Sequence, residues 1–250
     1  MTGKTIALVT GASSGLGREF CRQLAERCDL IIAVARRQER LAELQDELTE
    51  TTELYPVVAN LTTLEGVAKT IETLRQKGPL NYLVNNAGMS TYGKFTEQDI
   101  DAQHQIVSLQ INAVMALCRA VLPSMKERNR GAIINVSSVS SFVPFPTMTV
   151  YGGCKSFLTS FSEGLDMELA EYDIDIQCLC PGLVKTEFHS TESMADFPLA
   201  TVPGTHWGKA CNIVSESLSA LDDNNVIFAP GNENLQACRR GIDRILQQLM

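Results

Sequence analysis

Short apolar runs rich in β-branched residues alternate with amphipathic stretches, and this alternation constrains the fold more than any other feature of the chain. Such runs predict buried strands at Thr5–Thr10, Leu30–Ala35, Leu54–Ala59, Leu80–Val84, Ala132–Ser137, Ile174–Cys180 and Val226–Ala229. Apolar residues spaced by three and four predict helices through Phe20, Leu24 and Arg27, over 38–50, 62–76 and 97–128, from Tyr151 to Leu169, and over 206–221 and 234–249. We therefore expect one α/β domain over residues 1–250, a doubly wound parallel sheet of about seven strands with helices on both faces.

Composition narrows the partners that the chain can have. The 250 residues carry a formal net charge of −8, which argues against nucleic acid or an anionic membrane as the main partner. No apolar run reaches the roughly 18 residues that a membrane span needs. The N-terminal apolar stretch ends at Gly11 without a signal-peptide cleavage site. The expected location is therefore the cytoplasm.

The eight cysteines follow no metal-binding or disulfide pattern. None of them forms a C-x-x-C pair, and the histidines at 104, 189 and 206 are not grouped near any of them. Cys178 and Cys180 fall within a predicted buried strand. The sequence therefore predicts reduced, structural thiols and no metal site.

A glycine-rich turn follows the first predicted strand and precedes a helix. Gly11, Gly15 and Gly17 have the spacing G-x-x-x-G-x-G, which differs from the commonest dinucleotide motif and from the P-loop. Such a turn brings backbone N–H groups together, and the helix N-terminus adds a positive dipole, so the segment suits a phosphate group. The alternative interpretation is an ordinary tight turn.

The second predicted strand ends in Ala35-Arg36-Arg37, and the next acid is Glu39. In a dinucleotide-binding fold, an acid at this strand end binds the free 2′-hydroxyl of NAD, whereas an arginine accommodates the 2′-phosphate of NADP. Arg36 and Arg37 therefore favour NADP(H) over NAD(H). The alternative is that both arginines are solvated residues at a helix start.

Tyr151 and Lys155 stand four residues apart on a predicted helix, so both side chains project from the same face. A cation beside a phenol favours the phenolate and lowers the phenol's pKa. Such a phenol can exchange a proton with a substrate oxygen, although a solvated helix face would carry the same pair by chance. A site is favoured because the polar clusters follow strand ends, the edge where parallel sheets bind ligands; they are 11–17, 36–37, 85–88, 138 and 181–182.

Together these motifs resemble the short-chain dehydrogenase/reductase superfamily in its single-domain, Rossmann-like form, over nearly the whole chain. The order and spacing match at Thr10-Gly11 with Gly15 and Gly17, Asn85-Asn86-Ala87-Gly88, Ser138 thirteen residues before Tyr151, Lys155, and Pro181-Gly182 with Thr186. Asn112, ten residues before Leu122-Pro123, matches the fourth catalytic residue of the family.

The resemblance implies hydride transfer between a nicotinamide cofactor and a carbonyl or alcohol. It gives Tyr151 the role of general acid in reduction and base in oxidation, with Lys155 lowering its pKa and binding the nicotinamide ribose. It gives Ser138 the polarisation of the substrate carbonyl, and Asn112 the anchoring of a water for proton relay. The pattern also implies NADP(H) contacts at Gly11, Ser13, Ser14, Gly15, Leu16, Gly17, Arg36, Arg37, Asn60, Leu61, Asn86, Ala87, Gly88, Tyr151, Lys155, Pro181, Gly182, Val184 and Thr186.

Three features depart from the family's pattern. Asn60 stands where members usually carry an aspartate against the adenine, and its amide can still hydrogen-bond there. Ser14 stands where many NADP-dependent members have a basic residue, so the two arginines alone support NADP(H). Gly152 and Gly153 open the catalytic helix at a cost of about 1 kcal/mol each relative to alanine. Close packing against a second subunit, in a homodimer or homotetramer, would explain them; the alternative is drift at an exposed helix start.

The segments expected to line a substrate pocket are mostly apolar. They comprise residues 142–145, Met89 to Tyr92, and a lid-like stretch over 187–205 that contains Phe188, Met194 and Phe197. These segments hold no cluster of Arg or Lys that would pair a carboxylate or phosphate. We therefore expect a small hydrophobic carbonyl or alcohol as substrate, unless the same residues belong to the core.

Three other functions are open at this point. The run from Gly11 to Gly15 matches the G-x-S-x-G turn of an α/β-hydrolase, but only one strand precedes Ser13, and the base would have to be His189 or His206. A non-catalytic NADP-binding sensor or scaffold would keep the fold, although it has no need of the four catalytic residues. Within the family, the alternative enzyme is an NAD-dependent alcohol dehydrogenase.

Overall fold

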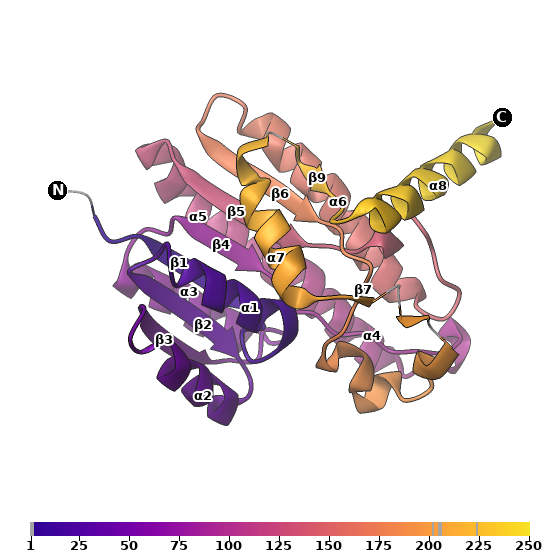
Figure 1. Cartoon of the computed structure of the whole chain (residues 1–250), viewed down its shortest axis with the longest axis horizontal. Helices are drawn as coiled ribbons and strands as arrows, with labels where there is room; N and C mark the ends of the chain where they lie inside the picture. The colour runs from indigo at the N-terminus through magenta and orange to yellow at the C-terminus, as the bar shows by residue number, and fades with distance from the viewer. Residues whose placement is uncertain (1–2, 202, 205–206, 224) are drawn as a thin grey trace.

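Seven strands form one parallel sheet in the computed structural model, which describes residues 3–201, 203–204, 207–223 and 225–250 (Figure 1). Every neighbouring pair in the sheet is parallel, and the strand order is β3-β2-β1-β4-β5-β6-β9. The prediction of a doubly wound sheet is confirmed, with strands β1 (Ile6–Thr10), β2 (Leu30–Ala35), β3 (Glu53–Val58), β4 (Tyr82–Asn85), β5 (Gly131–Val136), β6 (Ile174–Leu179) and β9 (Ile227–Phe228).

Helices cover both faces of this sheet (Figure 1). Because successive side chains of a strand point to opposite faces, Ala7 and Val9 of β1 pack with α1 and α7, whereas Ile6 and Leu8 pack with α5 and α6. All of these strand residues are buried, as expected for a parallel sheet between two helical layers. The helices are α1 (Gly15–Leu24), α2 (Gln38–Leu48), α3 (Leu64–Lys77), α4 (Ile100–Val107), α5 (Ala113–Arg128), α6 (Thr149–Glu168), α7 (Ala210–Ser219) and α8 (Asn232–Leu249).

The strand order places the polar clusters together. β1 pairs with β2 on one side and with β4 on the other, so the chain changes winding direction between β1 and β4. In open α/β sheets, ligands bind outside the carboxyl ends of the strands at such a switch point. The glycine-rich turn follows β1, and Asn86-Ala87-Gly88 follows β4, so both lie at this switch point.

The long helix predicted over 97–128 is interrupted. It consists of a 3₁₀ turn at Phe95–Glu97, then α4, a π-helical turn at Ser108–Asn112, and α5. By length and composition alone, the stretch Ile100–Arg128 is apolar enough to cross a membrane, contrary to our expectation from the sequence. Leu117, Val121 and Met125 lie in the core of the protein, which accounts for part of this apolar composition.

The chain after β6 differs most from the predicted elements. Two short strands that we did not predict, β7 (Leu183–Val184) and β8 (Trp207–Gly208), pair in parallel outside the main sheet. Between them lies a region that we call the cap segment, residues 185–204, with 3₁₀ turns at Glu187–Ser190, Glu192–Met194 and Leu199–Thr201. The helix predicted over 206–221 begins only at Ala210, and His206 lies outside the described residues.

The last helix, α8, projects away from the sheet toward the C-terminus (Figure 1). A further 3₁₀ turn, Leu221–Asp223, precedes β9. At the α8 start, Asn234 approaches Gly182, and Gly241 packs against the Phe142 backbone. Beyond these contacts its apolar side chains are exposed, at Ile242, Ile245, Leu246 and Leu249.

Candidate active site

The glycine-rich turn after β1 is packed too closely for larger residues. Gly11 and Gly15 have positive φ angles of 68° and 55°, a backbone region that glycine adopts without steric cost. A Cβ atom on Gly17 would lie only 2.3 Å from the Gly11 carbonyl oxygen. Ser14 precedes α1 in an extended conformation without capping the helix through its side chain, and Leu16 packs against the core. The turn therefore has the close backbone approach that was predicted for a phosphate cradle.

Thr10 ties the glycine-rich turn to the loop after β4. Its Oγ1 accepts hydrogen bonds from the backbone N–H groups of Asn86 and Ala87, each at 2.9 Å. The Asn86 side chain donates to the Thr10 carbonyl oxygen at 2.8 Å. Asn86 and Ala87 thus hold the shape of the turn, and Gly88 follows them directly at the same sheet edge. We call residues 10–17 and 85–88 together the cradle.

Arg36 and Arg37, which were predicted to contact the 2′ position of the cofactor's ribose, are not equivalent. Arg37 donates to the Ser13 hydroxyl from Nε at 3.3 Å and from Nη2 at 3.1 Å, so it is joined to the glycine-rich turn. It also pairs with Glu187 of the cap segment. Arg36 is exposed, with no hydrogen bond or ion pair of its side chain among the described residues. The structure therefore brings Arg37, and not Arg36, to the cradle.

At the end of β3, Asn60 and Leu61 occupy the position predicted for adenine contacts. The Asn60 Oδ1 accepts hydrogen bonds from the backbone N–H and the hydroxyl of Thr62, at 3.2 Å and 3.0 Å. Asn60 is exposed, while Leu61 is buried against the core. The turn uses the side-chain carbonyl oxygen of Asn60, and no hydrogen bond of its side-chain N–H groups is formed among the described residues.

Ser138, Tyr151 and Lys155 are brought together at the end of β5. The Tyr151 phenol shares a side-chain hydrogen bond with Ser138. Lys155 is 4% exposed and donates from Nζ to the Val136 carbonyl oxygen at 2.8 Å. Its Nζ lies 5.3 Å from the centre of the Tyr151 ring. The three residues that the sequence pattern joined across 17 positions are thus neighbours in the fold.

Burial controls the protonation of this pair. It raises the pKa of Tyr151 to about 12, and the hydrogen bond with Ser138 only partly opposes that shift. Burial also lowers the pKa of Lys155 to about 8. The pKa of Tyr151 is therefore not lowered in this structure, because loss of solvation disfavours the phenolate more than the hydrogen bonds with Ser138 and Ser140 favour it.

The role predicted for Asn112 stays a prediction, and the structure shows where the residue lies. Asn112 is the last residue of the π-helical turn and is exposed to solvent. The amide that faces the interior belongs to Gln110, which is 1% exposed and donates to the Met89 carbonyl oxygen at 3.0 Å. Its Oε1 is buried without a hydrogen-bond partner, 3.5 Å from the point where a Cβ on Gly88 would lie. Gln110 is the site residue that our sequence reasoning missed.

The segment after β6 covers the cradle. Pro181 accepts a backbone hydrogen bond from Val139 at 3.0 Å, which joins the ends of β6 and β5. Gly182 packs closely against Asn234, Val184 is buried, and the Thr186 methyl group contacts Gly15. Of the predicted cofactor residues of this segment, Thr186 therefore lies against the glycine-rich turn, while Pro181 and Gly182 contact the end of β5 and the start of α8.

Aromatic rings join the cap segment to the rest of the site. The Phe188 ring lies 5.7 Å from the Tyr151 ring, and Phe197 meets Tyr92 edge to face at 5.5 Å. These positions agree with the predicted pocket lining. Met194 does not line a pocket, because it is 0% exposed and lies among core side chains.

A hollow of about 380 Å³ lies beside residues 142–145. Val139, Val143 and Phe145 form one wall, and α8 forms the other with Arg240 and Arg244 among its lining residues. The predicted lining segments themselves carry no arginine cluster, but the fold brings these two arginines close to one of them.

Gly152 and Gly153 were predicted to pack against a second subunit. A Cβ on Gly152 would meet the Ser140 carbonyl oxygen of the same chain at 3.6 Å, and a Cβ on Gly153 would meet nothing within 4 Å. Gly152 therefore packs within the chain at an ordinary contact distance. The interface with a second subunit stays a prediction.

The remaining sequence patterns do not assemble a competing site in the described part of the chain. Ser13 receives hydrogen bonds from Arg37 and has no described contact with His189, which lies among the rings of Phe188, Phe197 and Trp207. No group of three His, Cys, Asp or Glu residues there has the arrangement of a metal site. The eight cysteines are free, and only Cys211 is exposed. Among the described residues the geometry therefore offers no hydrolytic Ser–His pair, and the other candidate base, His206, lies outside them.

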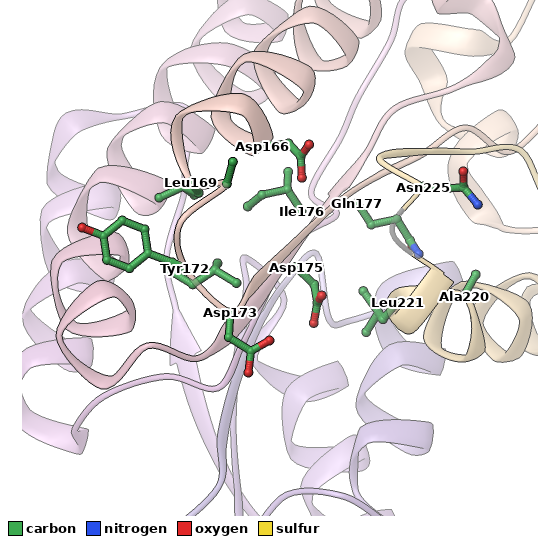
Figure 2. A pocket seen from close by; sticks show the side chains of 12 residues that line it. Asp166, Leu169, Tyr172, Asp173, Asp175, Ile176, Gln177, Ala220, Leu221 and Asn225 are labelled. Carbon is green, nitrogen blue, oxygen red and sulfur yellow. The ribbon is translucent and has the colours of Figure 1, made fainter.

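The hollow shown in Figure 2 is separate from these residues. Its volume is about 170 Å³, and it is lined by residues at the start of β6 and the end of α6, including Asp166, Asp173 and Asp175. The start of a parallel strand lies at the edge opposite the cradle. The Figure 2 hollow therefore takes no part in the site.

The fold and the cradle define a Rossmann-like nucleotide-binding protein. A family model described as short chain dehydrogenase matches residues 5–196. This chain therefore belongs to the short-chain dehydrogenase family, and its class is oxidoreductase. The matched region ends within the cap segment.

Individual relatives agree with this assignment. A short chain dehydrogenase of Pseudocercospora fijiensis is 36% identical over 75% of this chain, and the match spans 62% of that protein. A probable NADP-dependent dehydrogenase of Haemophilus influenzae is 34% identical over 77% of each chain. The structure of a short-chain dehydrogenase from Sphingobium yanoikuyae in complex with NADPH superimposes with a TM-score of 0.86, at 30% identity, over 98% of this chain and 94% of that one.

Proposed function

We propose that this chain transfers a hydride between NADP(H) and the carbonyl or alcohol of a small hydrophobic substrate, with Tyr151 as the general acid and base. The observation that carries the proposal is the position of the Tyr151 phenol, hydrogen-bonded to Ser138 and four residues from the buried Lys155. This group lies at the sheet edge that also holds the cradle. A proton donor and a nucleotide cradle at one edge are the two parts that a carbonyl reduction requires.

The residues of the cradle fit a dinucleotide. A side chain on Gly17 would collide with Gly11, so the backbone can approach a phosphate only with glycine there. Arg37 and Ser13 place a guanidinium and a hydroxyl at the end of β2, where a 2′-phosphate is bound in this fold. The NADPH complex of the Sphingobium relative and the NADP-dependent Haemophilus relative support NADP(H) rather than NAD(H).

Bound NADPH would supply the hydride, and the protein's own residues would manage the substrate oxygen. Because burial raises the pKa of Tyr151 to about 12, the phenol holds its proton at neutral pH and is ready to give it to an oxygen that gains negative charge. Ser138 would hold that oxygen by a second hydrogen bond. Lys155 has a pKa of about 8 and still carries its proton at pH 7, so it would stabilise the phenolate left behind.

Gln110 adds a second amide to the site in this proposal, beside the predicted Asn112. Its Oε1 is a buried acceptor with no partner beside Gly88, and buried polar atoms of this kind are normally paired. A donor group from a bound ligand would satisfy it. Gln110 is therefore assigned as a positioning residue between α4 and the cradle.

The substrate class follows from the rings around Tyr151. Phe188 lies against the phenol, and Tyr92 packs on Phe197 of the cap segment, so a substrate oxygen that reaches Tyr151 meets apolar walls. Such walls favour a hydrophobic body with one carbonyl or hydroxyl group. A homodimer or homotetramer is also part of the proposal, supported by the exposed apolar side chains on α8.

The first test is an equilibrium titration of the protein with NADPH and with NADH, read by cofactor fluorescence. NADPH should bind at least about tenfold more tightly, about 1.4 kcal/mol. Tyr151→Phe should change this affinity far less than it changes turnover, and it should lower kcat for a hydrophobic ketone by about 10² to 10⁴. Equal or tighter NADH binding would redirect the search to NAD-dependent alcohol oxidation, and binding of neither would favour a non-catalytic role.

A further inference from the structure

The carboxylate of Glu187 lies in the arginine site that the proposed function gives to the 2′-phosphate. Glu187 Oε2 is 2.7 Å from Arg37 Nη1, and Glu187 Oε1 is 3.7 Å from Arg40 Nη2. Arg37 is held in this position by its two hydrogen bonds to Ser13. A carboxylate shared by two guanidinium groups is an anion site already filled by the protein's own acid.

The ion pair crosses a long stretch of the sequence. Arg37 follows β2, whereas Glu187 opens the first 3₁₀ turn of the cap segment, 150 positions further along. The contact therefore fastens the cap segment to the cofactor half of the sheet. Both partners are about half exposed, at 45% and 49%, so a competing anion can reach them from solvent.

The residues on either side of Glu187 cover the rest of the site. The Thr186 methyl group lies 2.9 Å from the point where a Cβ on Gly15 would be, so it rests on the glycine-rich turn. Phe188 lies against the ring of Tyr151. Three consecutive residues thus contact the phosphate cradle, the arginine site and the proposed proton donor. A movement of Glu187 would therefore change the contacts at all three.

We propose that Glu187 competes with the 2′-phosphate of NADP(H) for Arg37 and Arg40, so that NADP(H), and not NAD(H), releases residues 186–188 from the cradle. This inference rests on the proposed NADP(H) function. NAD(H) carries an uncharged hydroxyl at the same position, so it has no anionic group that could replace the carboxylate at the two arginines. A ligand shifts a two-state equilibrium only by its differential affinity for the two states, and here the phosphate supplies that difference.

The position of Trp207 allows the release to be observed without catalysis. Trp207 is the single tryptophan of the chain. Its ring lies 5.2 Å from the His189 ring, two residues from Glu187 in the same 3₁₀ turn. A displacement of this turn would therefore change the surroundings and the fluorescence of Trp207.

The test uses adenosine 2′,5′-bisphosphate and 5′-AMP, which differ only in the 2′-phosphate and contain no nicotinamide. Affinities are measured by calorimetry, and Trp207 emission is recorded in parallel. Glu187→Gln should tighten binding of the bisphosphate about two- to fivefold, the size of a partly exposed ion pair, and leave 5′-AMP unchanged. The bisphosphate, but not 5′-AMP, should change Trp207 emission in the unmodified protein, and this response should shrink in Glu187→Gln.

Glu192→Gln is the matched control. Glu192 is an exposed acid of the same cap segment with no ion pair of its side chain among the described residues, and its substitution changes the net charge equally. It should change neither affinity. If Glu187→Gln leaves bisphosphate binding unchanged or weaker, or if Glu192→Gln has the same effect, the competition is disproved. If the unmodified protein binds both nucleotides equally, the NADP(H) function itself fails, which is a different result.

Discussion

The cradle and the cap segment are held by different kinds of contact. In the cradle, backbone N–H groups bond to Thr10 at 2.9 Å, and the approach of Gly17 to Gly11 leaves no room for a methyl group. The cap segment has a backbone hydrogen bond from Tyr92 to Ser193, but it is also held by side chains, through the Arg37–Glu187 ion pair and ring contacts such as Tyr92 with Phe197. Backbone contacts fix positions sharply, whereas ring contacts tolerate change. The difference indicates that cofactor geometry is fixed and that substrate fit can vary.

The largest expected effect of the rigid contacts in the cradle is at Gly17. Gly17→Ala places a Cβ 2.3 Å from the Gly11 carbonyl oxygen, and overpacking of this kind costs about 1–3 kcal/mol. We expect NADPH affinity to fall by roughly 10- to 100-fold, measured by the fluorescence titration. Gly153→Ala is the control, since nothing lies within 4 Å of its new Cβ. This variant should keep full affinity; a similar loss in both variants would show that the cradle is not specially constrained.

A smaller effect is expected at Gln110, where the cradle meets α4. Gln110→Leu removes the hydrogen bond to Met89 and the buried acceptor Oε1. The loss of one such interaction predicts a kcat about tenfold lower, with a shifted pH profile and little change in KM, measured by steady-state kinetics. Gln110→Glu keeps an acceptor but can donate to the Met89 carbonyl oxygen only when it is protonated, so it should recover part of kcat only toward low pH.

Asn112→Ala tests the role that the family resemblance gives to Asn112. Asn112 is exposed, and removing the side chain that would anchor the relay water should lower kcat and shift the pH profile, measured by the same kinetics. An unchanged kcat in Asn112→Ala with a lowered kcat in Gln110→Leu would assign the amide role to Gln110 alone.

The smallest expected effect concerns pH and Lys155. The folded pKa of Lys155 is about 8 against 10.5 for the free group. Between these values the unfolded chain binds a proton that the folded chain does not, so this lysine makes the protein more stable as pH rises through that window. Relative to Lys155→Met, the unmodified protein should gain on the order of 1–2 kcal/mol between pH 7.5 and 9.5, measured by denaturant unfolding.

Limiting the stability measurement to pH 9.5 and below avoids the titration of Tyr151. Its folded pKa of about 12 exceeds the free value of 10.0, so it lowers stability only as pH rises above about 10. The thiols of Cys21 and Cys28, whose pKa values are raised by burial, contribute to both proteins and cancel in the difference. A flat or falling difference would contradict the assignment of a desolvated Lys155.

The sequence predicted the cradle well because its constraints are local. Glycines at fixed spacing follow one apolar run, and an Asn-Ala-Gly loop follows another. Both patterns indicate which backbone positions must lie close together. The strands were also predicted, since each is an apolar run bounded by polar residues. The pair Tyr151 and Lys155 was found because four positions on an uninterrupted helix always share a face.

The face that Asn112 presents could not be predicted in the same way. Its role was assigned by counting back from Leu122-Pro123, and the π-helical turn at Ser108–Asn112 changes the face that each residue presents. Gln110 was missed, although Ile106, Ala113 and Leu117 are buried and Gln110 lies among them at steps of three and four. A polar residue on an apolar stripe was the signal that could have identified it.

The cap segment was not predictable in the same way. Its 3₁₀ turns are too short to produce a periodic pattern, and β7 and β8 are two residues each. The ion pair of Glu187 with Arg37 joins residues 150 positions apart, which no local pattern encodes. The raised pKa of Tyr151 likewise depends on how deeply the fold buries the phenol, and helix spacing carries no information on that depth.

The pairing of β7 with β8 allows the length and sequence of the cap segment to change. Leu183–Val184 pair with Trp207–Gly208, so the two ends of the intervening segment are held side by side outside the main sheet. Once its ends are held together, the free-energy cost of closing the loop grows only with the logarithm of its length. Evolution, or a designer, can therefore exchange this stretch to change which molecules the enzyme accepts, while the sheet that binds the nucleotide is inherited unchanged.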